Sequence, residues 1–91
     1  MDENIMQIAT YLAQSKSPAK IYQFLEELLT PAEIKDVALR WRIVKLLPQG
    51  VSQRKIAAQL HVSLCKITRG SKELKKSGSI IKEAVRNLEI L

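Results

Sequence analysis

Residues 53–69 read QRKIAAQLHVSLCKITR, and this segment carries the strongest structural signal in the chain. It contains two short helical patterns separated by a turn at His61. Ile56 and Leu60 lie one helical turn apart and are expected to face inward, and Ile67 of the second pattern is expected to pack back against them. This spacing predicts a helix-turn-helix, whose second helix enters the major groove of DNA.

The other positions of this segment fit the same interpretation. Ala57 is small enough for a close helix crossing, Val62 fills the corner, and Ser63 is expected to cap the second helix. The positions left to face outward are Gln53, Arg54, Leu64, Cys65, Lys66 and Thr68. Arginine and lysine suit guanine edges and phosphates, whereas glutamine and threonine suit bases or backbone. The alternative is an ordinary helical hairpin with a solvated charged face.

His61 and Cys65, two residues of the segment, each allow a second interpretation. The turn usually holds a glycine in the left-handed region, and histidine tolerates that region better than most residues. As a metal ligand His61 has no partner cluster, so a turn role is favoured. Cys65, near the start of the second helix, is either a redox-sensitive thiol or a small apolar contact to a thymine methyl group. Because it is the only cysteine, the contact is preferred.

Composition agrees with a small, basic, helical protein. The chain has 91 residues, which fits one domain, and 46% of them are hydrophobic, as in globular proteins. Fifteen basic residues against nine acidic ones give a net charge of +6, which favours a polyanion such as DNA as partner. A single cysteine excludes an internal disulfide, and no apolar run approaches the ~20 residues that span a bilayer. With no signal-peptide pattern at the start, a cytoplasmic location is expected.

Turn and cap signals divide the rest of the chain into further helices. The first is expected over residues 2–14. The second is expected to begin at Pro18, with Ser17 as its cap, and to extend to about Leu29. The third begins at the capping box Thr30-Pro31-Ala32-Glu33 and ends before Pro48.

Serines and apolar positions mark the remaining helices. Val37, Ile43, Leu46 and Leu47 are expected on the core face of the third helix. Ser52 is expected to cap a helix over 53–60. Ser63 is expected to cap the next helix, which ends at Lys75 or Lys76, and Ser79 is expected to cap the last one.

These patterns predict an all-α fold of about six helices in a single domain, 1–91. Its parts are two dimerisation helices (1–29), a core helix (30–51), the helix-turn-helix (52–76) and a C-terminal dimerisation helix (79–91). Six helices on so short a chain leave apolar faces uncovered on the first, second and last helices. We therefore expect an intertwined homodimer with one reading head per subunit.

Three stretches resemble the tryptophan (trp operon) repressor family. They are Leu29-Thr30-Pro31-Ala32-Glu33, Arg40-Trp41-Arg42-Ile43-Val44, and Ser52-Gln53-Arg54 followed by Ile67-Thr68-Arg69-Gly70-Ser71. The resemblance covers residues 28–75. It implies an intertwined helical homodimer that uses L-tryptophan as corepressor, with no other cofactor and no membrane.

The resemblance also implies a ligand site. In the family the indole lies between two arginines, which match Arg40 and Arg69, and planar guanidinium groups do stack on aromatic rings. Gly70 is expected to leave room for the ligand, and Leu29 and Thr30 match wall positions that either subunit contributes. On spacing alone, Arg40 and Arg69 are better explained as solvated helix arginines, and the surrounding motif reverses that preference in favour of the ligand site. Trp41, about 100° from Arg40 around the helix, is assigned to the core or the dimer interface.

The chain departs from the family pattern at several positions. Lys66 and Glu73 stand where the family has threonine and serine, Ala57 replaces a base-reading lysine, and the loop at Gly50 is one residue shorter. Lys66 is expected to contact either a phosphate or the ligand carboxylate. Glu73 is expected either to meet the ligand ammonium or to repel DNA. These departures leave room for a ligand other than tryptophan.

Together these observations predict a repressor that binds a palindromic operator of tryptophan biosynthesis or transport genes. The expected base and phosphate contacts are Gln53, Arg54, Leu64, Cys65, Lys66, Thr68, Ser71 and Lys72. The alternatives are a ligand-independent helix-turn-helix regulator of another operon and a helical protein-interaction module. An enzyme is not expected, because the sequence has no acid pair, no Cys/His arrangement and no phosphate loop.

Overall fold

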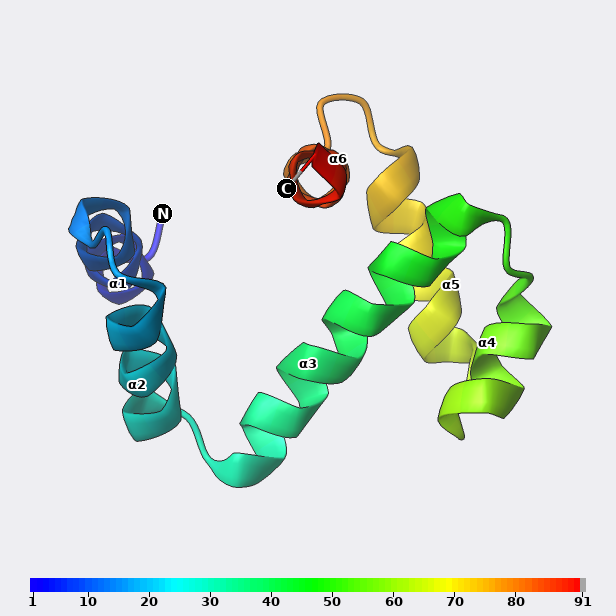
Figure 1. Ribbon diagram of the computed structural model, residues 1–91, viewed down its shortest axis with the longest axis horizontal. Coiled ribbons are helices and arrows are strands. Elements are labelled where there is room, and N and C mark those ends of the chain that lie inside the picture. Colours follow the sequence, from blue (N-terminus) through cyan, green and yellow to red (C-terminus); the bar gives the residue numbers. More distant parts are fainter. Residues whose placement is uncertain (91) are drawn as a thin grey trace. The chain divides into compact units, whose positions relative to one another are not determined.

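The chain is entirely helical over the residues that the structure, a computed structural model, describes (1–90). These residues form six α-helices, one short 3-10 helix and no strand (Figure 1). The elements are α1 (Glu3–Gln14), α2 (Pro18–Leu28), α3 (Pro31–Leu46), η1 (Leu47–Gln49), α4 (Gln53–Leu60), α5 (Leu64–Lys75) and α6 (Ile80–Ile90). The predicted all-α class and helix number are confirmed. The chain divides into two compact units, Met1–Lys35 and Asp36–Leu91.

Side-chain caps explain where most of the helices begin. The Ser17, Ser52 and Ser79 hydroxyls accept hydrogen bonds from backbone N–H groups three residues on, at 3.3, 3.2 and 3.1 Å. Each bond satisfies an amide that has no partner inside its helix. Ser63 holds the N-cap position of α5, but its hydroxyl makes no capping bond. The prediction that Ser63 caps through its side chain is therefore wrong.

The capping box before α3 forms as predicted. The Thr30 N–H donates to Glu33 Oε1 at 2.9 Å, and the Glu33 N–H donates to Thr30 Oγ1 at 3.2 Å. Hydrogen bonds to the ionised carboxylate, first from the Thr30 backbone and then from its hydroxyl, hold the pKa of Glu33 below its usual value.

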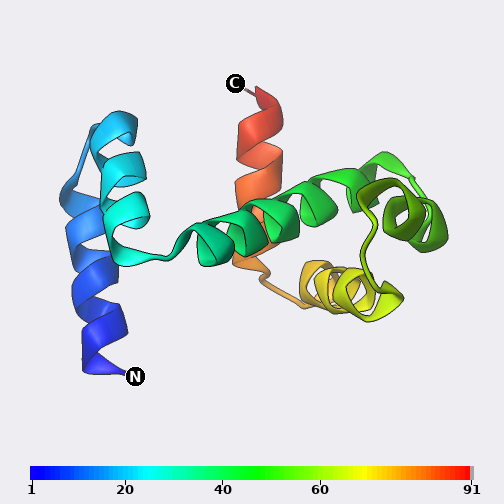
Figure 2. The same cartoon turned by 90° about the horizontal axis from the view of Figure 1, so that it is seen from below.

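The first unit has little interior of its own. α1 and α2 lie side by side as a helical hairpin (Figure 2), joined by the rings of Tyr11 and Phe24, whose centroids are 4.8 Å apart. Neither helix contains a buried residue, and the side chains of Ile5 and Tyr22 are 64% and 65% exposed. No helix in the described range is long and apolar enough to cross a membrane.

The second unit is built on three fully buried isoleucines. Ile43 of α3, Ile56 of α4 and Ile67 of α5 form one cluster. Partly buried side chains that pack on this cluster are Leu39, Leu46, Leu47, Val51, Ala57, Leu60 and Val62. The inward positions predicted for the helix-turn-helix are therefore confirmed. Val37, which was expected in the core of the third helix, is instead 51% exposed.

Local backbone geometry completes the second unit. His61 ends α4 in the left-handed region with φ of 55°, as expected for the turn. The next helix, α5, packs against both α4 and α6. Val85 of α6 is buried in this unit. α5 is thus packed against its neighbours on one side, while Cys65, Arg69 and Lys72 remain exposed on the other.

Candidate functional site

A hollow of about 650 Å³ opens between α3 and α5, with one residue from α6. We call it the α3–α5 hollow. Its lining is Val37, Arg40, Trp41, Ile43, Val44, Cys65, Lys66, Arg69, Gly70, Glu73 and Ile81. The apolar members suit an aromatic or aliphatic ligand, and the charged members, three cations and one carboxylate, suit polar groups on it.

The structure brings together four of the six residues predicted for the ligand site. Arg40 comes from α3, and Arg69, Gly70 and Glu73 come from α5. Arg40 and Arg69 are exposed, so both guanidinium groups are available to a molecule in the hollow. The other two predicted residues belong to the first unit, where the Thr30 hydroxyl caps α3. Their place with respect to the hollow remains a prediction.

Gly70 is needed for helix packing as well as for the hollow. A Cβ atom at this position would lie 3.1 Å from Ile43 Cγ2, 3.5 Å from Val44 Cγ1 and 3.6 Å from Leu47 Cδ1. These atoms all belong to α3 or to the residue that follows it. The glycine therefore lets α5 approach α3 closely. Space for a ligand, the role expected of Gly70 from the resemblance, is therefore not its only role.

Trp41 and Val37 also line the hollow, although neither was predicted to do so. Trp41, which was assigned to the core or dimer interface, is half-buried there. The sequence held a signal for both residues. Val37, Arg40, Trp41 and Val44 follow one another at spacings that place them on a single face of a helix.

The outward surface of α5 carries a second, shallower depression of about 580 Å³. It is lined by Cys65, Thr68, Arg69, Lys72, Glu73 and Lys76, which share one face of the helix. Of the predicted DNA contacts, Cys65, Thr68 and Lys72 lie here. Cys65, Arg69 and Glu73 line both depressions, so α5 separates them as a common wall.

The remaining predicted DNA contacts are distributed unevenly. Arg54 and Leu64 are exposed near the starts of α4 and α5. The Thr68 hydroxyl is within hydrogen-bond distance of two acceptors, the Leu64 carbonyl oxygen of its own helix at 3.0 Å and Gln53 Oε1 of α4 at 3.3 Å. The contact with Gln53 joins α5 to α4. Lys66 is exposed and faces the α3–α5 hollow.

Ser71 differs from the other predicted contacts. It is 9% exposed and lines a separate depression with Leu47 and Val85. Its side chain is therefore not offered to DNA in this structure, and we leave it out of the DNA-binding surface.

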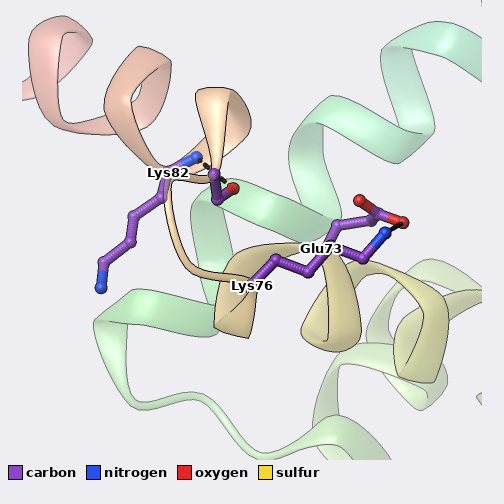
Figure 3. Close-up of polar contacts among 4 residues, drawn as sticks. Glu73, Lys76 and Lys82 are labelled. Carbon is purple, nitrogen blue, oxygen red and sulfur yellow. Dashed lines mark hydrogen bonds and ion pairs between the residues drawn. The ribbon is translucent and has the colours of Figure 1, made fainter.

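The charge pattern around the site is strongly one-sided. Residues 37–82 contain eleven basic residues and a single acidic one, Glu73. The Glu73 carboxylate is paired with Lys76 Nζ at 2.9 Å across one turn of α5 (Figure 3). The Lys76 and Glu73 side chains are 63% and 42% exposed, so solvent screens the pair and it adds little to stability. The surface around it attracts polyanions.

Comparison with known proteins agrees with this geometry. A family model described as Trp repressor protein matches residues 3–89. A Trp operon repressor homolog of Chlamydia caviae is 39% identical over 74 residues, which cover 80% of this chain and 73% of the relative. A Trp operon repressor homolog of Vibrio cholerae is 36% identical over 83 residues, which cover 90% of this chain and 81% of the relative.

A third relative, a Trp operon repressor homolog of Chlamydia trachomatis serovar L2, is 44% identical over 66 residues, covering 67% of this chain and 70% of the relative. Among solved structures, none matches the chain significantly. Because the family match spans nearly the whole chain, the resemblance seen in the sequence is confirmed. The chain belongs to the Trp repressor family, a family of non-enzymatic DNA-binding regulators.

Proposed function

We propose that the protein is a homodimeric transcriptional repressor that binds a palindromic operator when L-tryptophan occupies the α3–α5 hollow. Its targets are operators of tryptophan biosynthesis or transport genes. The observation that supports this most strongly is that Arg40 and Arg69, from two helices, line one largely apolar hollow directly behind the helix predicted to read DNA.

The hollow offers what an aromatic amino acid needs. Guanidinium groups stack on an indole face and also form charge-assisted hydrogen bonds with a carboxylate. Val44 and Trp41 supply apolar contact for the ring. Lys66 adds a third cation that reaches the ligand carboxylate.

The ligand acts on DNA binding through α5. This helix is the wall shared by the hollow and the basic outer surface, so a molecule wedged against α3 sets the angle of α5. Occupied hollows hold the two reading heads of the dimer at the separation of successive major grooves, and empty ones let the heads shift. Such coupling between sites is typically ~1–3 kcal/mol.

DNA is contacted by the starts of α4 and α5 and by the outer face of α5. Arg54 and Lys72 supply phosphate or guanine contacts, and Leu64 and Cys65 supply apolar contacts to bases. Gln53 and Thr68, which lie within 3.3 Å of each other, act as one polar unit at the junction of the two helices. The uncovered apolar faces of α1 and α2 are buried in the dimer.

Calorimetry and DNA binding test the proposal. L-tryptophan should bind the free protein at sub-millimolar concentration, and the loaded protein should select a palindrome from a random duplex library. Arg69→Ala should lower ligand affinity and operator affinity together, whereas Arg42→Ala, an exposed arginine of α3 outside the hollow, should leave ligand affinity unchanged. Binding of DNA without any binding of tryptophan favours a ligand-independent regulator. A flat response to salt favours a protein-interaction module.

A further inference from the structure

A second hollow, of about 410 Å³, opens between η1, α5 and α6. We call it the α5–α6 hollow. Of the described residues, none that lines it also lines the α3–α5 hollow or the depression on the outer face of α5. All of its lining residues belong to the second unit, so its form does not depend on where the first unit lies. The ligand site and the DNA surface proposed above therefore leave this hollow without a role.

The base of the α5–α6 hollow is apolar. Leu47, Leu74 and Val85 line it, and Val85 is 4% exposed. Ser71, which is 9% exposed, adds a hydroxyl that can donate a hydrogen bond to a bound molecule. Small-molecule sites have volumes of about 300–1,000 Å³, an apolar lining and a few polar groups. The hollow has the size and the lining of such a site.

Three cations stand around this base: Lys75 of α5, and Lys82 and Arg86 of α6. All three residues are exposed, and no acidic residue in the described part of the chain lines the hollow with them. Lys82 and Arg86 are four residues apart on α6, a spacing at which like charges destabilise a helix. Figure 3 shows the Lys82 side chain extending away from the Glu73–Lys76 pair, so that carboxylate does not neutralise it. A bound anion would relieve the repulsion among the three cations.

The cations and the apolar base together favour one class of anion. A phosphate monoester carries nearly two negative charges at neutral pH and presents three acceptor oxygens, as many as there are cations in the hollow. A single carboxylate has one charge and two oxygens. The apolar base adds binding free energy only if the phosphate is attached to a ring or a hydrocarbon chain.

A small molecule fits the hollow better than a DNA phosphate does. Leu74 is nine residues from Cys65, which at about 100° per residue places it on the opposite side of α5 from a residue of the outer depression. A stiff duplex on the outer face of α5 therefore lies away from the α5–α6 hollow. A duplex also keeps its bases stacked inside, so its backbone brings no apolar ring to the base of the hollow.

We infer that the α5–α6 hollow is a second ligand site, which binds a small phosphate monoester with an apolar body. Lys75, Lys82 and Arg86 hold the phosphate, and the apolar body rests on Leu74 and Val85. A ligand held in this way joins the end of α5 to α6, so its binding stabilises the folded second unit. The inference goes beyond the proposed function and does not depend on the binding of tryptophan.

Binding is tested by ¹H–¹⁵N NMR titration of the full chain with phenyl phosphate, a ring that bears one phosphate. The backbone amides of Ser71 and Val85 should shift saturably at millimolar concentration, and the midpoint of thermal unfolding should rise. Inorganic phosphate lacks the ring, and phenylacetate has one carboxylate in place of the phosphate. Each should bind about tenfold more weakly than phenyl phosphate, because it loses either the apolar contact or part of the charge.

Substitutions in the hollow test which residues hold the ligand. Lys82→Gln together with Arg86→Gln should weaken the binding of phenyl phosphate about tenfold or more. Lys55→Gln, at an exposed lysine of α4 outside the hollow, is the matched control and should leave the affinity unchanged. Ser71→Ala should weaken binding about two- to tenfold through the loss of one hydrogen bond.

Four outcomes overturn the inference. If phenyl phosphate shifts only residues of the α3–α5 hollow, or none saturably, the α5–α6 hollow is not a ligand site. If inorganic phosphate or phenylacetate binds equally well, the class of ligand is wrong. If the double variant and Lys55→Gln have the same effect, the attraction comes from the net charge of the protein. If a mixed-sequence duplex displaces phenyl phosphate from Val85, the hollow belongs to the DNA surface. Calorimetry with L-tryptophan remains a separate test, so failure of the proposed function is distinguishable from each of these.

Discussion

The two units of this chain differ in charge and in how far they bury their own apolar side chains. The first unit, Met1–Lys35, has three basic and five acidic residues, and its two complete helices contain no buried residue. The second unit, Asp36–Leu91, has twelve basic and four acidic residues and its own buried core. The contrast indicates that the first unit needs another surface to cover its apolar side chains. The second is able to hold a binding surface in place without that help.

The largest effect is expected from the core of the second unit. Ile56→Ala removes a fully buried side chain between α3 and α5 and should lower the free energy of unfolding by about 2–5 kcal/mol, measured by urea denaturation. Leu64→Ala, at a position of α5 that is 45% exposed, should change this free energy by less than about 0.5 kcal/mol. Equal effects of the two substitutions would show that the second unit is not held by this core.

The second effect concerns the first unit. Replacing Ile5 and Tyr22 together by aspartate places charge on the apolar faces of α1 and α2 and should raise the dimer dissociation constant by about 100-fold or more. Sedimentation equilibrium measures this constant. Lys20→Gln, an exposed change on α2, is the control. A dimer that survives the double substitution would mean that these faces are covered in some other way.

A smaller effect is expected when one basic residue of each unit is replaced and the salt dependence of DNA binding is compared. Arg54→Gln should lower the slope of log K against log salt for duplex binding by about 0.9, because one phosphate contact and its released counterion are lost. Lys20→Gln in the first unit should leave the slope unchanged. Fluorescence anisotropy with a labelled duplex at several salt concentrations measures both. If Lys20→Gln has the larger effect, the first unit also binds DNA.

Much of this organisation was predictable from sequence, because it depends on local signals. The capping box at Thr30, the left-handed turn at His61 and the isoleucine spacing of the helix-turn-helix each act within a few residues. Periodicity tells which residues share a face, but not which neighbour that face meets. For this reason Val37 was placed in the core, although it lies at the edge of the α3–α5 hollow.

The same limit applies to Trp41 and Ser71, two residues near the site whose surroundings the sequence did not predict. Trp41 and Arg40 point about 100° apart around α3, yet the hollow is wide enough to be lined by both. Ser71 was grouped with DNA contacts by its place after Gly70, but it faces Leu47 and Val85 across the opposite side of α5. Such choices depend on how helices distant in sequence cross, which no local signal reports.

The smallest effect is expected where the two units meet in sequence, at the start of α3. Hydrogen bonds from Thr30 lower the pKa of Glu33, so the folded state favours the ionised carboxylate more than the unfolded chain does. The stabilisation is therefore complete above the usual pKa of about 4.5 and is lost as the pH falls through the lowered value. Glu33→Gln keeps an oxygen acceptor but cannot ionise. The difference in stability between wild type and this variant should shrink from neutral pH towards pH 3. A difference that stayed constant across this range would mean that the charge of Glu33, as distinct from its shape, does not help α3 to begin at Pro31.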